Sequence, residues 1–446
     1  MAKTSHEIRD PIHVFIRLDS QERKVLDSRP FQRLRYIHQL ALTYLLYPGA
    51  THRRFEHSLG VMELASRVFD IVTDPAKVSD AVKELFPPIN SEDERRYWRR
   101  VLRMAALCHD IGHLPFSHAA EEELFPPGWD HERMTMELIQ SDEMKEIWEN
   151  ARPPLSSEDI VKLALGPKKA KELQFDDWET MLSEIIVGDS FGVDRMDYLL
   201  RDSYHAGVAY GRFDHHRLID TLRILPPPLY PYGNQLDNSK EPSLGVEKGG
   251  IHSAEALLLA RYFMFTQVYC HHVRRIYDIH LKDFLIDWLG ETKYPTDIDA
   301  FLKLTDNEIT SDLRDACLDA ERPGHIHADR IINRKHFKLL YTRNPTDFKI
   351  NSDAANLVKE AAVKEYGEDK VRLDGYSKKG GITDFPVLSD DGKTVLSALQ
   401  ESQVLAKIPS VVVNYVFVDP NIRDEALRWF NKGKAQIITP QKEEQK

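Results

Sequence analysis

Hydrophobic residues recur at helical spacing through about the first 220 residues of the chain. Val61, Leu64, Val68 and Val72 are each three or four positions apart, which places them along one face of an α-helix. The stretch 98–108 is apolar on nearly all sides, and this composition is typical of a helix buried in a core. This part of the sequence therefore predicts a mainly helical core.

Turn-forming residues interrupt the helical pattern. Proline pairs at 87–88, 126–127 and 153–154 predict loops between helices. The segment 226–250 is rich in proline, glycine and asparagine, and it predicts a β-hairpin or an exposed loop. A helical pattern then resumes over 253–289.

The pattern changes again after about residue 325. Segments 335–342 and 411–418 are rich in β-branched and aromatic residues and predict strands. A weaker strand pattern lies at 370–373, and 423–431 predicts a helix. This part of the chain therefore mixes strands with helices.

The predicted fold class is mainly α, with a smaller α+β lobe at the C-terminal end. We expect a helical core over residues 1–324, which contains the turn-rich insertion 226–250, followed by the lobe over 325–446. The charged tail 441–446 is expected to be disordered.

Composition excludes some classes of protein. The 446 residues are 42% hydrophobic and 29% charged, which is typical of a globular chain. Sixty Lys and Arg against 71 Asp and Glu give a net charge of −11, which argues against broad nucleic-acid binding but allows a local basic groove. The three scattered cysteines and the lack of a long apolar run favour a cytoplasmic protein without a membrane span.

Histidine is concentrated in one part of the helical core. His109 and Asp110 follow the apolar stretch 98–108, so both are expected to be buried. Burying a carboxylate costs several kcal/mol unless it is paired or binds a metal, although a core hydrogen bond would also satisfy one such pair. Six histidines lie between positions 52 and 131: His52, His57, His109, His113, His118 and His131.

Two later segments carry polar residues at helical spacing. Asp194, Tyr198 and Asp202 are four residues apart and share a helix face, which suits either a phosphorylated ligand or solvent. Arg261 and Tyr269 lie eight apart in an apolar helix, where the arginine needs a partner, either a phosphate or an internal carboxylate.

These residues together resemble the H…HD…D signature of the HD phosphohydrolase superfamily. The chain is most similar to the dNTP triphosphohydrolase branch, which includes the sterile-alpha-motif HD proteins and bacterial relatives. The matching stretches occur in order up to about residue 275: DPIH at 10–13, PFQRLRYI at 30–37, YPGATH at 47–52, RFEHSLGV at 54–61, HDIGH at 109–113, PFSH at 115–118 and VDRMDY at 193–198.

The resemblance implies a metal-dependent enzyme that converts a dNTP and water into a deoxynucleoside and tripolyphosphate. His57, His109, Asp110 and Asp194 would hold a divalent metal, with Mn, Fe, Mg, Co and Ni all open. The implied catalytic residues are those that contact the phosphates or move the proton: His113, His118, Glu121 and His131.

The resemblance also implies the substrate contacts. Arg54 would bind the inner phosphates, while Arg195, Tyr198 and Arg261 would bind the outer ones. The sugar and its surroundings would be read by a second group of residues: Gln39, Leu40, Asp202 and Tyr269. Ala41-Leu42-Thr43 and Cys270 depart from the family pattern, which leaves the base preference open.

A regulatory nucleotide, GTP or a dNTP, is a further implication of the resemblance. Asp27, Gln32 and Arg35 match residues that read a guanine, although they would equally suit a packing network. The resemblance also implies a homo-oligomer, with a tetramer expected.

Two other functions remain open from the sequence. The metal ligands would equally serve a phosphodiesterase or nuclease acting on single-stranded nucleic acid, a cyclic nucleotide or an alarmone. A sensor without catalytic activity is the third reading, and the intact set of ligands and His118 argues against it.

The role implied for His118 is testable. His118→Ala should keep metal and substrate binding but lose turnover, because the leaving 5′-oxygen would lack its proton donor. Substrate-binding titrations and single-turnover kinetics measure the two effects separately. A wild-type rate would contradict the role.

Overall fold

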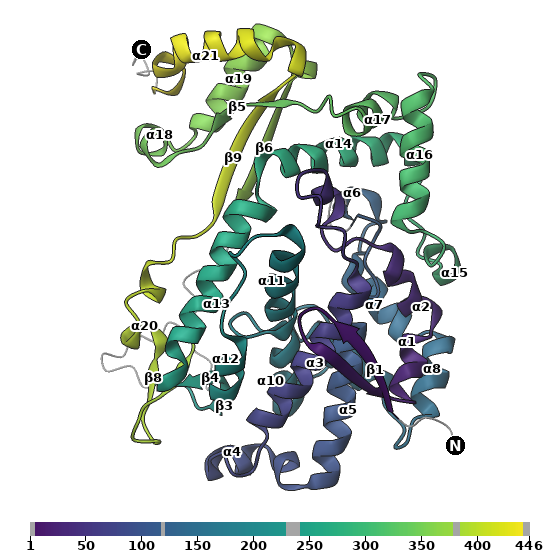
Figure 1. Ribbon diagram of the computed structural model, residues 1–446, viewed down its shortest axis with the longest axis vertical. Coiled ribbons are helices and arrows are strands. Elements are labelled where there is room, and N and C mark those ends of the chain that lie inside the picture. The colour runs from purple at the N-terminus through teal and green to yellow at the C-terminus, as the bar shows by residue number, and fades with distance from the viewer. Residues whose placement is uncertain (1–4, 117–120, 229–240, 378–383, 440–446) are drawn as a thin grey trace. The chain divides into compact units, whose positions relative to one another are not determined.

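The computed structural model describes residues 5–116, 121–228, 241–377 and 384–439. The chain forms two compact units, whose segments alternate along the sequence (Figure 1). Unit 1 comprises residues 1–264, 293–307 and 381–408, and unit 2 comprises residues 265–292, 308–380 and 409–446. The mainly α fold class with a smaller α+β part is confirmed. The domain division at residue 324 stays a prediction, and the tail 441–446 lies outside the described residues.

Unit 1 is built around two long helices that pack against each other, α3 (Arg54–Val72) and α5 (Glu92–Cys108). The predicted apolar face of α3 is confirmed, since Val61, Leu64 and Val68 are completely buried. Its helices are α1 (Glu22–Leu26), α2 (Arg29–Arg33), α3 (Arg54–Val72), α4 (Asp80–Leu85), α5 (Glu92–Cys108), α6 (Glu121–Leu124), α7 (His131–Ile139), α8 (Asp142–Glu149), α9 (Ser157–Leu165), α10 (Asp177–Val187), α11 (Val193–Ala206), α12 (His215–Thr221), α13 (Ile251–Met264), α15 (Ile298–Phe301) and α20 (Ala398–Glu401).

The start and end of α5 follow from its sequence. Ser91 caps it by accepting a hydrogen bond from the backbone N–H of Glu94, and three acidic residues in the first turn favour the helix dipole. Its residues 101–108 are buried, as predicted, and all are apolar except Arg103, which pairs with Glu22, so His109 and Asp110 follow in the interior.

Unit 1 also holds two small sheets. Strands β1 (Ser5–Asp10) and β2 (Val14–Asp19) form an antiparallel hairpin. The second sheet has the order β3-β4-β7-β8. Strand β3 (Leu222–Leu225), just before the segment 226–250, pairs antiparallel with β4 (Ser243–Glu247) near its end. Residues 229–240 lie outside the described part, so the form of the insertion stays a prediction. The late strands β7 (Pro386–Leu388) and β8 (Val395–Ser397) complete the sheet, with β7 parallel to β4.

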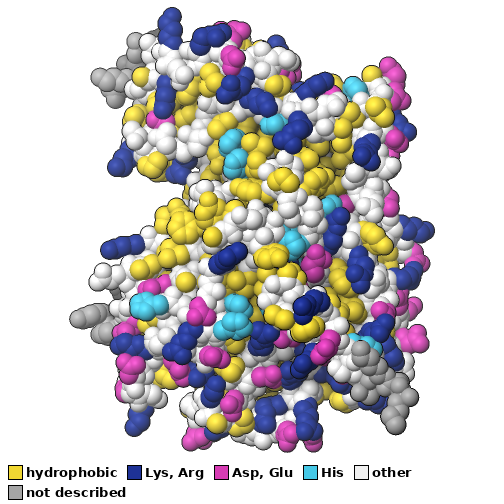
Figure 2. All heavy atoms as spheres, viewed as in Figure 1, with side chains coloured by type: hydrophobic (Ala, Val, Ile, Leu, Met, Phe, Trp, Pro, Cys, Tyr) yellow, Lys and Arg dark blue, Asp and Glu magenta, His cyan; other side chains and the backbone are white. Residues whose placement is uncertain are grey.

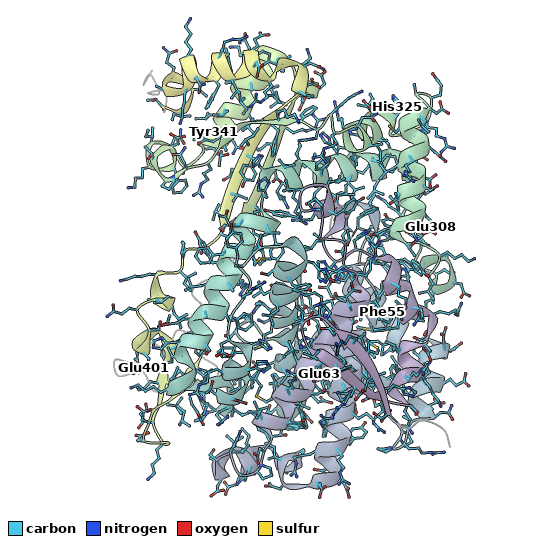
Figure 3. The ribbon with its side chains drawn as sticks, in the orientation of Figure 1. Phe55, Glu63, Glu308, His325, Tyr341 and Glu401 are labelled. Atoms are coloured by element: carbon cyan, nitrogen blue, oxygen red, sulfur yellow. The ribbon has the colours of Figure 1, made fainter. Side chains whose placement is uncertain are left out.

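Unit 2 contains an antiparallel sheet in the order β5-β9-β6, which confirms the three predicted strands. Tyr341 of β5, labelled in Figure 3, stacks edge-on against Phe430 of α21, so that helix covers the sheet. Its elements are α14 (His272–Leu289), α16 (Asp306–Leu318, which begins in unit 1), α17 (His325–Ile332), β5 (Lys338–Thr342), α18 (Pro345–Ile350), α19 (Ala354–Tyr366), β6 (Val371–Ser377), β9 (Val412–Val418) and α21 (Arg423–Ile438).

The helix expected over 253–289 is not continuous. A π-helical turn, Phe265–Tyr269, follows α13, and the backbone N–H of Cys270 donates to the carbonyl of Phe265. The His271 side chain then caps α14 by accepting from the N–H of Val273. Periodicity missed this break because the flanking residues stay apolar on both sides.

Charged side chains of both signs are interspersed on the face drawn in Figure 2. Of the helices in the described part of the chain, none combines the length and the apolar composition needed to cross a membrane.

One buried histidine in unit 2 links the stability of the fold to pH. His280 is fully buried, and its Nε2 accepts a hydrogen bond from the backbone N–H of Phe337. Burial lowers the pKa of His280 to about 2, with help from the neighbouring charges of Arg330, His327, His336 and Arg372. Between about pH 2 and pH 6.5 the unfolded chain, where this pKa is about 6.5, therefore binds a proton at His280 that the folded chain does not bind.

The free energy of unfolding should consequently fall as the pH falls below about 6.5, by up to about 1.4 kcal/mol per pH unit from this residue. His280→Gln keeps an acceptor for Phe337 but cannot titrate, so its free energy of unfolding should change less steeply with pH. Urea unfolding between about pH 7.5 and 5.5 measures both slopes. The exposed His252→Gln is the control, and equal slopes in all three proteins would contradict the assignment.

Candidate metal and phosphate site

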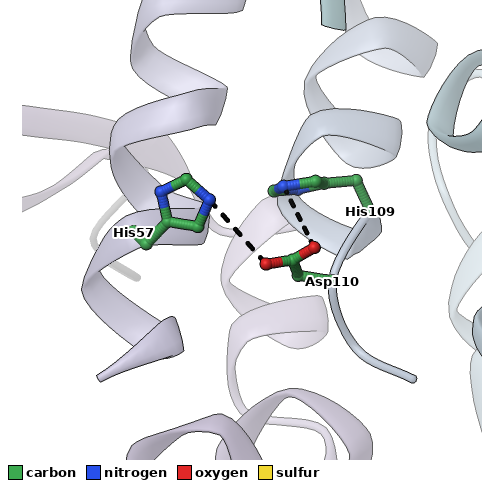
Figure 4. Close-up of side chains that lie close together, drawn as sticks. All are labelled: His57, His109 and Asp110. Carbon is green, nitrogen blue, oxygen red and sulfur yellow. Dashed lines mark ion pairs between the residues drawn. The ribbon is translucent and has the colours of Figure 1, made fainter. Parts of the chain in front are cut away.

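Three helices bring the four predicted metal ligands together in unit 1. His57 lies in the first turns of α3, His109 and Asp110 follow α5, and Asp194 is the second residue of α11. Ligand atoms of His57, His109 and Asp110 lie within 4.8 Å of one another (Figure 4). Asp194 Oδ1 is 3.1 Å from His57 Nε2 and 3.5 Å from His109 Nε2. Its side chain is 36% exposed, so the cluster is open to solvent on this side.

Hydrogen bonds orient both histidines for ligation. The Nδ1 of His57 lies 2.9 Å from Asp197 Oδ2, and the Nδ1 of His109 lies 2.8 Å from the carbonyl of Ala106. Each Nδ1 therefore donates a hydrogen and directs Nε2 into the cluster, where it can ligate a metal that displaces any proton it carries. The Nε2 of His109 is buried without a hydrogen-bond partner among the described residues. These donors fit a divalent metal, and the His and Asp set does not select one metal among several.

The charges of the cluster also favour a cation. Burial opposes the protonation of His57, but hydrogen bonds to Asp194 and Asp197 outweigh it and raise the pKa to about 10. Burial likewise opposes ionisation of Asp194, yet the neighbouring rings of His109, 3.5 Å away, and His57, 3.1 Å away, hold its pKa below the usual range. The pKa of Asp110 is lowered against burial by the charge of His109. The carboxylates thus stay ionised and attract positive charge.

Asp197 supports the ligands from behind, and sequence reasoning did not assign it a role. It accepts hydrogen bonds from His57 and, at 2.8 Å, from Nε2 of His13. Arg201 donates to both of its oxygens at 2.8 and 2.9 Å and to Asp10 at 2.8 Å. All these side chains are buried. The available signal was the presence of Asp197 and Arg201 at i and i+4 in the same helix as Asp194.

The helix α3 carries two further residues that shape the cluster. Gly60 faces α11, and a Cβ there would overlap the side chains of Asp197 and Arg201, so only glycine allows this approach. Arg54, in the first turn of α3, forms an ion pair with Oδ2 of Asp110. The Arg54 guanidinium, which is predicted to contact the phosphates, is therefore already held beside Asp110.

The predicted catalytic residues lie beside Asp110. Nε2 of His113 is 3.2 Å from Asp110 Oδ1, and the His113 ring stacks on His131 with centroids 4.2 Å apart. Glu121 accepts from Nδ1 of His131 at 2.6 Å. Burial and this hydrogen bond act in opposite directions on His131, and its pKa is raised. His118 lies outside the described residues, and its role stays a prediction.

The predicted outer-phosphate residues form a second group. Arg195 and Arg261 both donate to the backbone carbonyl of Asp189, the latter at 3.5 Å. The pKa of Tyr198 is raised by burial and responds to the charges of both arginines, so the three side chains are neighbours. The pKa of Asp189 is lowered, mainly by a hydrogen bond from Lys168. This group therefore brings Arg195, on the helix that carries Asp194, together with Arg261 of α13 at one backbone carbonyl.

Two of the predicted sugar contacts meet at one histidine. The backbone N–H of Gln39 donates to the carbonyl of His52, and Nε2 of His52 lies 2.7 Å from Asp202 Oδ1. Leu40, the residue after Gln39, is buried. Tyr269 belongs to the π-helical turn of unit 2, so its predicted role stays a prediction.

The residues predicted to bind a regulatory nucleotide have protein partners. Oε1 of Gln32 accepts from Arg35 at 2.9 Å, and the Arg35 guanidinium lies 3.5 Å from the ring centre of Phe55, which Figure 3 labels. Asp27 pairs with Arg23 at 3.2 Å. The packing alternative accounts for these contacts, and the nucleotide site stays a prediction.

Comparison with known proteins gives two matching family models. The HD domain matches residues 54–172, and the HD associated region matches residues 213–369. His57, His109 and Asp110 fall within the first match, while Asp194 falls between the two.

Related proteins span a wide range of organisms. Uncharacterized protein MJ1154 of Methanocaldococcus jannaschii is 35% identical over 69% of this chain and 54% of its own length. Deoxynucleoside triphosphate triphosphohydrolase SAMHD1 of Homo sapiens is 31% identical over 68% of this chain and 50% of its own length. The chain thus spans about half the length of these relatives. A crystal structure of a hypothetical protein from Aquifex aeolicus is 33% identical, with a TM-score of 0.74, and covers 95% of this chain and 99% of its own.

The position of Asp197 behind His57 leads to a prediction. Asp197→Asn keeps the shape but removes the charge that orients His57, so Mn²⁺ affinity should fall about 10- to 100-fold. Isothermal titration calorimetry measures it, with Asp70→Asn as a control because Asp70 pairs with Arg99 on the outside of the helix pair. His13→Gln, a milder change in the same network, should show a smaller loss. Unchanged affinity in a folded Asp197→Asn protein would contradict the role.

Proposed function

Since the chain belongs to the HD-domain family of metal-dependent hydrolases, we propose that it hydrolyses dNTPs to a deoxynucleoside and tripolyphosphate. One observation carries the proposal. The helix α11 bears Asp194 in the His and Asp cluster, then Arg195 at the next position and Tyr198 one turn further on, both in the cationic group with Arg261. A metal site next to a set of phosphate donors suits a polyphosphate substrate. The similarity to SAMHD1 supports a dNTP as that substrate.

His57, His109, Asp110 and Asp194 would hold the divalent metal. When bound, it supplies a Lewis acid that polarises a phosphoryl oxygen and makes water more acidic. The Asp197 carboxylate keeps His57 in the tautomer that ligation requires.

The remaining residues would bind and orient the triphosphate. Arg54 and the neutral His113 lie at the cluster and would contact the inner phosphates. The pKa of His113 is lowered well below its usual value by burial and by Arg54, so it would act without a charge. Arg195 and Arg261 would release the backbone carbonyl of Asp189 and donate instead to the outer phosphates, which are stronger acceptors.

The chemical step would break one bond and form another at the α-phosphorus. Water adds to phosphorus, and the bond from phosphorus to the 5′-oxygen breaks. That oxygen takes a proton, which we assign to His118. Glu121 and His131, held together at 2.6 Å, would orient the proton donor.

Substrate choice and regulation complete the proposal. Gln39 and Asp202 would read the sugar 3′-hydroxyl, and Tyr269 would disfavour a 2′-hydroxyl. A GTP or dNTP bound near Asp27, Gln32 and Arg35 would activate the enzyme, and a homotetramer is the expected assembly.

Product analysis tests the proposal. Purified protein with Mn²⁺ and each dNTP, alone and with GTP or a second dNTP, should release a deoxynucleoside and tripolyphosphate. Asp194→Ala should lower the rate by more than about 100-fold, because a ligand matters more than the outer-shell partners that cost up to this factor. Asp70→Asn, on the outer surface, should keep the rate.

The products also separate the alternatives. Release of pyrophosphate would place the cleavage on the other side of the α-phosphorus. No turnover of any dNTP by metal-loaded protein would reject the proposal and make single-stranded nucleic acid the next substrate to try.

A further inference from the structure

Two arginines of unit 2 rest on the same aromatic ring. The guanidinium of Arg330, in α17, lies 4.5 Å from the ring centre of Phe337, and that of Arg372, in β6, lies 5.5 Å from it. The ring holds both cations by its negative face. Their charges repel each other, and burial together with Arg372 lowers the pKa of Arg330.

No carboxylate neutralises either arginine at hydrogen-bond distance among the described residues. The nearest approaches are 3.9 Å, from Arg330 Nη2 to Asp419 and from Arg372 Nε to Asp283. Arg372 Nη1 donates instead to backbone carbonyls, including that of Val371 at 3.0 Å. Both guanidiniums therefore keep N–H donors for an external acceptor.

A buried histidine, His280, packs edge-on against the same Phe337 ring, with the ring centres 5.3 Å apart. Because Nε2 of His280 accepts from the backbone N–H of Phe337, the ring hydrogen sits on Nδ1. That nitrogen is buried without a partner among the described residues. His280, Asp283 and His327 each have a possible metal-ligand atom within 4.8 Å of the others. The hydrogen on Nδ1, the occupied Nε2 and the two arginines all disfavour a cation there.

The arginines line a cavity of about 450 Å³ that lies within unit 2. Its basic lining residues are His327, Arg330, Lys370 and Arg372, and its acidic ones are Asp369 and Asp419. Oδ1 of Asp419 accepts from the backbone N–H of Asn421 at 2.9 Å, and its Oδ2 lies 3.9 Å from Arg330. The volume lies in the range of small-molecule sites and exceeds what one phosphate needs.

We propose that this cavity binds a phosphate chain, with Arg330 and Arg372 as its principal donors and Lys370 at its rim. Guanidinium groups match phosphate oxygens with paired donors, and a phosphate chain would relieve the repulsion between the two arginines. The ligand is either a free oligophosphate or the phosphate chain of a nucleotide. This inference does not rest on the proposed function, because it concerns binding in unit 2 and needs no hydrolysis.

Calorimetric titration of the full-length protein with sodium tripolyphosphate and, separately, with a non-hydrolysable GTP analogue tests the proposal. Arg330→Gln with Arg372→Gln should weaken tripolyphosphate binding at one class of site at least tenfold. The matched control is Arg343→Gln, since Arg343 also stacks on a ring, Phe348 at 4.0 Å, but lies outside the cavity. It should bind as the wild type does.

A variant that lacks the proposed phosphate donors of unit 1 distinguishes binding at the two sites. With Arg195→Gln and Arg261→Gln in place, the tripolyphosphate binding that remains should still depend on Arg330 and Arg372. Arg330→Lys with Arg372→Lys keeps the charges but loses the paired donors. It should bind several-fold more weakly than the wild type, and it serves as the test if the glutamine variant does not fold.

The outcomes distinguish the ligands. Equal affinity for both probes would identify free oligophosphate as sufficient, and tighter binding of the analogue would identify a nucleotide. Tripolyphosphate binding within twofold of wild type in the folded glutamine variant would overturn the proposal. It would also be overturned by Mn²⁺ binding that His327→Ala abolishes and the arginine changes leave intact.

Discussion

The buried ion pair between Asp197 and Arg201 is the constraint on which the candidate site depends. One carboxylate accepts from Arg201, His13 and His57, and so joins the N-terminal hairpin, α3 and α11 at a single point. A charge buried at this depth is strongly destabilising unless all its partners are present. Folding of these elements and orientation of the predicted metal ligand His57 are therefore coupled, and Gly60 lets the two helices come close enough for it.

The site also shows how charge is arranged across one helix. The N-terminal turn of α11 holds a carboxylate that attracts a cation, and the next residues hold an arginine and a phenol that favour an anion. Metal-bound polyphosphate carries both kinds of charge, so the helix provides complementary partners within two turns. Its third turn carries Asp202, which His52 holds in place for contact with the sugar in the proposed function.

Much of this could be predicted from the sequence, for identifiable reasons. Periodicity predicted α3 and α5 because their apolar faces pack on each other, and ordered motifs predicted the four residues that the structure brings together in one cluster. Asp197 escaped because its partners His13 and Arg201 come from distant and adjacent positions, and helical spacing alone also describes a solvated surface. The pairing of Arg330 with Arg372 over Phe337 could not be predicted, since three separate segments supply it. The end of α13 at Met264 could not be predicted from the hydrophobic pattern, because apolar residues flank the π-helical turn on both sides.

The alternation of segments between the units has a consequence for dissecting the protein. The chain changes unit after residues 264, 292, 307, 380 and 408, so no single cut separates one unit from the other. The sheet of unit 1 is completed by β7 and β8, which are synthesised long after β3 and β4. A ribosome-bound chain must therefore wait for residues 386–397 before that sheet can close. Truncation from the C-terminal end would expose the edge of β4, and a transplanted unit would need to be rebuilt from three pieces.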